Sequence, residues 1–219
     1  KHNGCIIADS VGLGKTFEAL AVIRYFELLN YRILVLCPKK LSGNWTIYQS
    51  SKNNNLNPFK NDKFNYHVLY HTDMGRLHGN SDADNHDLSN FNWGAYDLVV
   101  IDESHNFRGN PMDKANDDGT FRMNRAKWLM EKILKEGVNS KVLMLSATPV
   151  NNNLRDLRNQ FQLITKGNNA ALFETTQVKD ISSSLKNAQT LFSNWADSKK
   201  NPNRTVKQLI EKLDSSFFK

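Results

Sequence analysis

Five short apolar runs constrain the fold of this 219-residue chain more than any other feature, because each is long enough for one strand and they are mostly continuous. Continuous apolar strands are typical of a parallel sheet that is covered on both faces. Helix-periodic segments lie between several of the runs, at 16–30, roughly 43–53 and 125–137. This alternation predicts an α/β fold with helices on both faces of a parallel sheet. The expected strands are residues 4–8, 32–37, 66–70, 96–101 and 141–145.

The segments between and after these runs are polar. Residues 71–92 and 107–124 are rich in turn-forming residues, so we expect two long surface loops. Gly137 follows the third helical segment and is expected to cap it. After residue 165 the strands stop, and helices are expected at about 179–197 and 203–218.

Charge and cysteine content narrow the class of protein. The net charge of +7 suits a phosphate-backbone partner, and equally suits a solvated basic surface. No apolar stretch is long enough to span a membrane, so we expect no membrane partner. Cys5 and Cys37 both fall in expected buried strands, which indicates a reducing compartment with neither disulfide nor metal. The first expected strand begins already at residue 4, so we expect a piece of a longer protein.

The run DSVGLGKT joins the first expected strand to the first expected helix. In such a turn, backbone N–H groups point at the phosphates of a nucleotide, Lys15 reaches the β- and γ-phosphates, and the Thr16 hydroxyl holds Mg²⁺. The general pattern of a phosphate-binding loop has glycine where this chain has Asp9, so the loop alone does not establish a nucleotide-binding site. The expected nucleotide-binding residues are Asp9, Ser10, Val11, Gly12, Leu13, Gly14, Lys15 and Thr16.

Two further polar groups follow expected strands. Asp102 and Glu103 suit phosphoryl transfer, in which one carboxylate holds Mg²⁺ and the other orients the attacking water. Alternatively, the pair caps a helix or lies in a solvated turn. Ser146 and Thr148 follow the last strand and place hydroxyls at the same edge, or form an ordinary turn.

In this order and each after a strand, DSVGLGKT, DESH and SATPVNNNLRDL resemble motifs I, II and III of superfamily 2 helicases, and more narrowly those of Swi/Snf-type DNA translocases. In that family the phosphate loop commonly begins with Asp, which accounts for Asp9. The segment ILVLCPKKLSGNW resembles motif Ia. The resemblance covers residues 4–165 and implies a RecA-like P-loop NTPase sandwich. It makes 1–165 the ATP-binding lobe and 166–219 a helical extension toward a second lobe outside this chain.

Family roles then transfer to matching positions. The resemblance implies ATP and Mg²⁺ as cofactors, with Lys15, Asp102 and Glu103 as catalytic residues and Thr16 and Asp102 as metal ligands. It implies that His105, Ser146 and Thr148 couple the nucleotide to the nucleic acid. It also implies a double-stranded DNA contact at Pro38, Lys39, Lys40, Ser42, Asn151, Asn152 and Asn153.

Departures from the family pattern, such as Ser104 in the acidic motif and Ser146-Ala147 in motif III, favour a divergent, bacterial-type, cytoplasmic and nucleoid-associated protein. The expected function is that of an ATPase lobe that tracks along duplex DNA and is weak or inactive alone. The alternatives are a strand-separating helicase, the motor of a restriction system, or a catalytically silent nucleotide-gated binding module.

Overall fold

The computed structural model describes residues 3–52, 55–115, 119, 121–150, 153–197 and 205–213. Its centre is a sheet of five strands in the order β1-β7-β4-β2-β3, and every neighbouring pair is parallel. The expected α/β fold with a parallel sheet is therefore confirmed. The strands are β1 (Gly4–Ile7), β2 (Ile33–Cys37), β3 (His67–Tyr70), β4 (Leu98–Ile101) and β7 (Lys141–Leu145).

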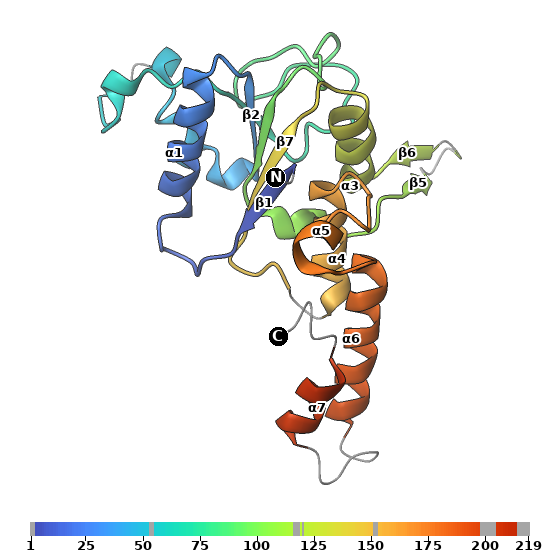
Figure 1. Cartoon of the computed structure of the whole chain (residues 1–219). Helices are drawn as coiled ribbons and strands as arrows, with labels where there is room; N and C mark the ends of the chain where they lie inside the picture. Colours follow the sequence, from blue (N-terminus) through green and yellow to red (C-terminus); the bar gives the residue numbers. More distant parts are fainter. Residues whose placement is uncertain are drawn as a thin grey trace.

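Helices cover both faces of this sheet (Figure 1). On one face lie α1 (Lys15–Leu28) and the short α2 (Gly43–Thr46); on the other lie α3 (Arg125–Trp128), the π-helical η5 (Leu129–Lys135) and α4 (Leu154–Ile164). Short 3-10 turns occupy much of the rest: η1 (Lys39–Leu41), η2 (Ser50–Lys52), η3 (Lys60–Asp62) and η4 (Ser104–Phe107).

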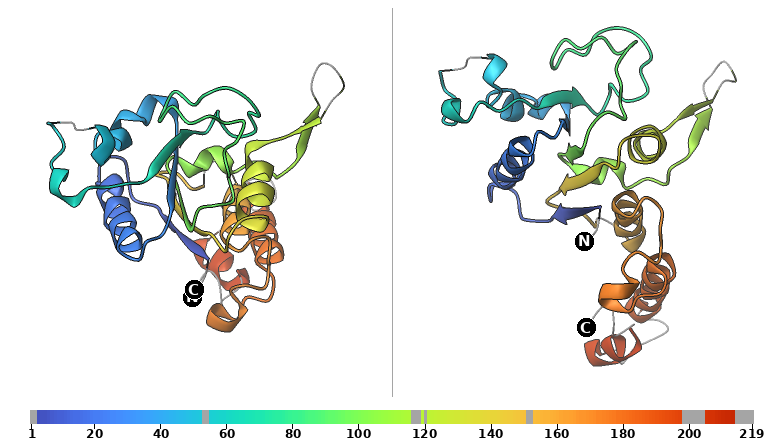
Figure 2. Two further views of the ribbon diagram at one scale, coloured as in Figure 1. Left: turned by 90° about the horizontal axis from the view of Figure 1, so that it is seen from above. Right: turned by 45° about the horizontal axis from the view of Figure 1, so that its top comes forward.

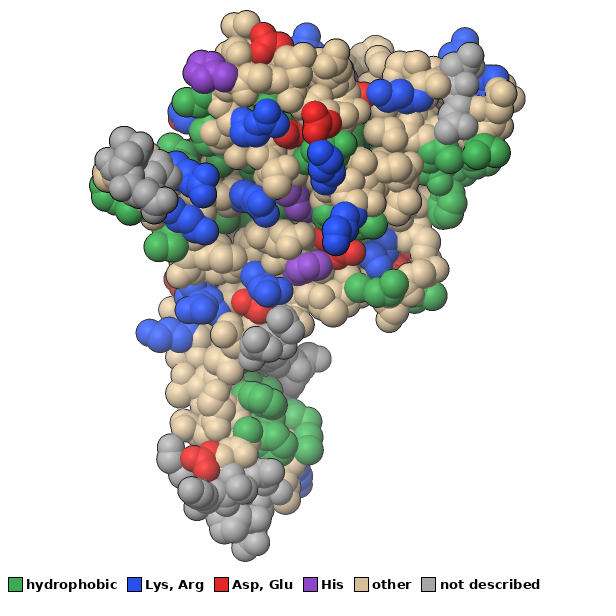
Figure 3. Space-filling view, turned by 180° about the vertical axis from the view of Figure 1, so that it is seen from behind, with side chains coloured by type: hydrophobic (Ala, Val, Ile, Leu, Met, Phe, Trp, Pro, Cys, Tyr) green, Lys and Arg blue, Asp and Glu red, His purple; other side chains and the backbone are tan. Residues whose placement is uncertain are grey.

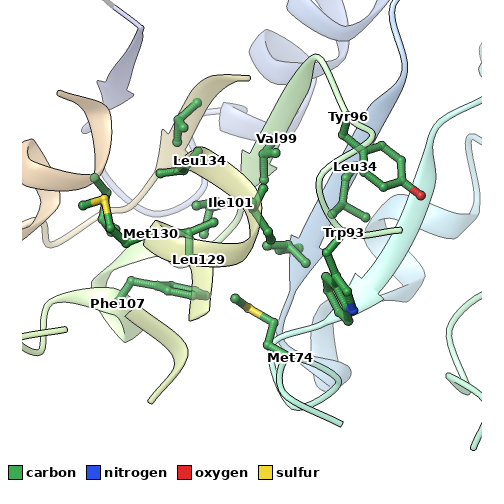
Figure 4. Packing of buried hydrophobic residues seen from close by; sticks show 14 of the residues in the cluster. Leu34, Met74, Trp93, Tyr96, Val99, Ile101, Phe107, Leu129, Met130 and Leu134 are labelled. Atoms are coloured by element: carbon green, nitrogen blue, oxygen red, sulfur yellow. The ribbon is translucent and has the colours of Figure 1, made fainter. Parts of the chain in front are cut away.

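Both faces of the central strands are buried, which explains their continuous apolar sequence. In β4, Leu98 and Val100 pack in the cluster under α1, while Val99 and Ile101 pack against η5. Figure 4 shows the cluster on the η5 side of the sheet, in which Leu129 of η5 lies close to Ile101. Strand residues must alternate between the faces, so a strand buried on both sides needs apolar residues at every position.

The edge strand β1 corrects one expectation. Cys37 is buried as expected, but Cys5 is exposed because it lies in β1, which pairs only with β7 among the described strands. A strand at the edge of a sheet has less cover than a central one. Burial raises the pKa of the Cys37 thiol to about 12.

Other differences lie between the strands. The expected loop 107–124 contains an antiparallel hairpin of β5 (Asp113–Ala115) and β6 (Phe121–Met123), which projects from the body in Figure 2. The expected helix at 43–53 is confined to α2 and η2. Gly137 follows η5 without a left-handed φ; an added Cβ would lie 2.3 Å from the Ile133 carbonyl oxygen and 2.9 Å from the Gly94 Cα, so close backbone approach requires the glycine.

The segment after residue 165 is helical as expected: α5 (Phe173–Thr176), α6 (Ile181–Ala196) and α7 (Val206–Lys212). The helix α6 packs along α4 through a separate small cluster that includes Val178, Ile181 and Leu185, and α6 and α7 extend away from the sheet (Figure 1). Within the described residues, no helix is long and apolar enough to cross a membrane.

Candidate functional site

The segment between β1 and α1 is an exposed loop that turns through two left-handed glycines. Gly12 has φ 84° and Gly14 has φ 90°, and Gly14 directly precedes the first residue of α1. Such angles are unstrained only in glycine, and they let successive backbone N–H groups face one concave surface. An added Cβ at Gly12 would meet no atom within 4 Å, so backbone conformation rather than crowding requires glycine there.

Lys15 folds back over this loop. Its Nζ donates hydrogen bonds to the carbonyl oxygens of Asp9, at 2.9 Å, and Ser10, at 3.0 Å. The ammonium group therefore lies inside the turn, at the N-terminal end of α1, where the helix dipole and free N–H groups already favour an anion. Thr16 follows it in the first turn of the same helix. Val11 and Leu13, at the tip of the loop, are 85% and 65% exposed.

Asp102 follows β4 at the same edge of the sheet as this loop, because parallel strands all end there. Its Oδ2 accepts a hydrogen bond from Trp45 Nε1 at 2.9 Å, and its Oδ1 accepts one from the Glu103 backbone N–H at 2.9 Å. Burial raises the pKa of the Asp102 carboxyl, and the Trp45 hydrogen bond opposes that rise. Trp45, the last residue of the segment that resembles motif Ia, therefore fixes the orientation of this carboxylate.

Glu103 adopts a left-handed backbone with φ 49°, a conformation that is strained for a residue with a side chain. Its Oε2 lies 3.1 Å from His105 Nδ1, and the same nitrogen lies 3.4 Å from the Ser146 hydroxyl oxygen. The Ser146 hydroxyl also accepts a hydrogen bond from the Thr148 backbone N–H at 3.2 Å. The structure thus brings together the acidic segment and the segment after β7.

A second connection between these segments runs through a residue that the sequence did not reveal. Gln160 of α4 is fully buried; its Oε1 accepts a hydrogen bond from the Ser104 hydroxyl at 3.0 Å, and its Nε2 donates to the Pro149 carbonyl at 2.6 Å. A polar residue in the middle of an amphipathic helix gives no periodic signal, so only the fold identifies it.

The expected nucleic-acid residues are partly separated. Pro38 precedes η1, and the Ser42 hydroxyl donates to the Lys39 carbonyl at 2.9 Å. The Lys39 ammonium pairs with Asp82 at 2.7 Å and lies 5.7 Å from the centroid of the Tyr70 ring. Lys40 is exposed.

On the other side, the Asn153 side chain accepts a hydrogen bond from the Arg155 backbone N–H at 2.9 Å and so caps α4. Asn151 and Asn152 lie outside the described residues.

These features define a class of protein. A left-handed glycine turn before a helix, a lysine folded over it, and an acidic pair at the carboxyl edge of a parallel sheet are the parts of a P-loop nucleotide-binding site.

The comparisons give the family. The sequence model of one protein family, the SNF2-related domain, matches residues 1–214, and the chain belongs to this family. The parallel sheet with helices on both faces is the α/β fold that the motifs predict.

Individual relatives are distant. The chain is 26% identical over 164 residues to nucleoside triphosphatase I of Amsacta moorei entomopoxvirus, covering 74% of this chain and 24% of that protein. It is 28% identical over 176 residues to the uncharacterized ATP-dependent helicase YqhH of Bacillus subtilis, covering 76% of this chain and 27% of that protein. It is 28% identical over 174 residues to the chromodomain-helicase-DNA-binding protein 1-like of Mus musculus, covering 71% of this chain and 17% of that protein. The chain thus spans about a quarter or less of these relatives.

Among solved structures, the Sulfolobus solfataricus SWI2/SNF2 ATPase core in complex with dsDNA aligns with a TM-score of 0.49 and 18% identity, over 95% of this chain and 38% of that chain.

Proposed function

We propose that this chain is the ATP-binding lobe of a DNA-dependent ATPase that translocates on double-stranded DNA and hydrolyses ATP to ADP and phosphate. The observation that carries the proposal is the position of Lys15, Asp102 and Glu103 at one edge of the sheet, within a family whose relatives are named as nucleoside triphosphatase and ATP-dependent helicase.

The residues fit Mg²⁺. This ion prefers one or two protein oxygens together with substrate phosphates and water, and Thr16 and Asp102 supply a hydroxyl and a carboxylate. The two N–H donors on Asp102 leave further lone pairs on its oxygens. No cluster of three or more His, Cys, Asp or Glu side chains able to hold a metal occurs in the described part of the chain, so a ligand set shared with the nucleotide suits this site. Bound Mg²⁺ neutralises charge on the phosphates.

The residues of the chain then have separate roles in binding and hydrolysis. Backbone N–H groups of 9–14 and the Lys15 ammonium hold the phosphates, and Glu103 orients the attacking water. The contact of His105 with both Glu103 and Ser146 gives a physical path from the nucleotide to the segment after β7. We propose that loss of the γ-phosphate alters this contact and shifts the grip of residues 38–42 and 151–153 on DNA.

The test is hydrolysis with and without duplex DNA. Because the second lobe is proposed to complete the ATP site, we expect slow turnover by the 219-residue chain and DNA-stimulated turnover by a longer polypeptide that includes that lobe. Glu103→Gln should lower turnover of the longer polypeptide at least about a hundredfold while nucleotide still binds. Full DNA-stimulated turnover by the chain alone would contradict the role of the second lobe. Unchanged turnover in Glu103→Gln would favour a catalytically silent module.

A strand-separating helicase is the second candidate, supported by the name of the Bacillus subtilis relative. A forked duplex separates the two functions, because a translocase hydrolyses ATP and leaves the strands paired. Release of the displaced strand in step with hydrolysis would favour the helicase.

A further inference from the structure

A groove of about 880 Å³ lies beside the β5–β6 hairpin, away from the phosphate loop. Its walls come from the segment after β3, the segment after η4, the hairpin strands and the start of α3. The lining contains four basic residues and not one acidic residue among the described positions. The basic residues are Arg76, Lys114, Arg122 and Arg125.

Three of these cations form no ion pair with an acidic residue in the part of the chain that the structure describes. Arg76 pairs with Asp73 at 2.9 Å, but within the described residues no ion pair is formed by Lys114, Arg122 or Arg125, all of which are exposed. The neighbouring Lys127, in contrast, pairs with Asp113 at 2.6 Å.

The register of the hairpin makes this arrangement unusual. Lys114 and Arg122 are directly opposite each other in the antiparallel pair, so their side chains lie on the same face of the ribbon. Like charges at opposite positions of a hairpin are unfavourable unless an anion lies between or above them. Phe121, on the same strand, is 74% exposed, and Met112 is 54% exposed. Asp117 and Asp118 follow β5 in the sequence and lie outside the described residues.

The base of the groove is fixed to the helix after motif III. Asn110 accepts hydrogen bonds at its side-chain oxygen from Asn159, at 2.9 Å, and Arg158, at 3.2 Å, and at its carbonyl from Asn124, at 2.7 Å. Both Asn159 and Arg158 belong to α4, the helix that contains Gln160. Figure 3 shows Lys and Arg side chains gathered on this side of the body, next to the projecting hairpin.

We propose that this groove binds the phosphate backbone of duplex DNA, as a contact separate from residues 38–42 and 151–153. The inference rests on the proposed function, because it takes the same DNA as its occupant. A two-stranded ribbon fits against a duplex, and three cations that form no ion pair among the described residues complement the negative charge of the phosphates.

The experiment measures binding of a fluorescent duplex by the 219-residue chain across salt concentrations. In the triple variant Lys114→Gln, Arg122→Gln and Arg125→Gln, the negative slope of log affinity against log salt should become shallower by about 2 to 3, since each lost phosphate contact removes about one unit of slope. The matched control removes the same charge from the tail and should keep the wild-type slope. It carries Lys179→Gln, Lys186→Gln and Lys212→Gln.

The outcomes separate the two proposals. An unchanged slope in the triple variant, with wild-type binding intact, overturns the groove assignment and leaves the proposed function standing. Equal decreases in both triple variants also overturn it, because the effect would then follow net charge alone. No binding of duplex by the wild-type chain at low salt contradicts the DNA partner itself. A variant with the single change Lys114→Glu guards against misfolding: it replaces a like-charge pair by an ion pair, so it should keep thermal stability and still weaken binding.

Discussion

Replacing Gln160 by leucine tests the connection between the acidic segment and the segment after β7. Leucine keeps much of the side-chain volume but cannot accept from Ser104 or donate to Pro149, which lie 3.0 Å and 2.6 Å from the Gln160 amide. Because Gln160 and Ser104 are both fully buried, water cannot replace the lost partner of the Ser104 hydroxyl, whereas Pro149 is half-buried.

The magnitude follows from the two groups that lose their hydrogen-bond partner, of which the Ser104 hydroxyl is fully buried. Each buried polar group left without a partner costs about 1 to 3 kcal/mol, and the added apolar contact of leucine offsets a part. We expect Gln160→Leu to lower the free energy of unfolding by about 2 to 4 kcal/mol, or the midpoint of thermal unfolding by about 5 to 15 °C.

The assay is guanidinium unfolding of four proteins: wild type, Gln160→Leu, Ser104→Ala and the double variant. Ser104→Ala removes the hydroxyl that Gln160→Leu leaves unpaired, so the double variant should be more stable than the sum of the single changes predicts, by about 1 kcal/mol. Strict additivity would refute the reasoning, because it would mean that Ser104 and Gln160 do not interact.

Three further outcomes follow from single contacts. Burial lowers the pKa of His71 to about 4, so below about pH 6.5 the unfolded chain binds more protons than the folded chain. The free energy of unfolding should therefore fall by about 3 kcal/mol as the pH is lowered from 6.5 to 4, as measured by denaturant unfolding at a series of pH values. The fall should be smaller in His71→Gln. Gly137→Ala should destabilise by about 1 to 3 kcal/mol in denaturant unfolding, whereas Gly109→Ala, where a Cβ meets no atom within 4 Å, should change stability by less than about 1 kcal/mol. Trp45→Phe removes the donor to Asp102 and should raise the pKa of that carboxyl, visible by NMR titration; an unchanged pKa would contradict the role given to the indole.

The central strands were predictable because burial on both faces requires an apolar residue at every position. Each of the five expected runs contains a strand of the sheet, including the edge strand β1. The hairpin was not, since Asp113–Ala115 and Phe121–Met123 are too short and too exposed to give a periodic signal.

The site divides in the same way. The phosphate loop and the acidic pair are local in sequence, so their residue types and spacing identify them. Trp45 and Gln160 act on residues 57 and 56 positions away, and only the fold brings such partners together.

Binding of a nucleotide in the presence of Mg²⁺ tests the central claim most directly. Isothermal titration of a non-hydrolysable ATP analogue into the 219-residue chain should give binding at one site. Lys15→Ala should weaken it at least about tenfold, and Lys186→Ala, on the distant α6, should leave it unchanged. Equal affinity of the wild type and Lys15→Ala would contradict the assignment of residues 9–16 as the phosphate-binding loop.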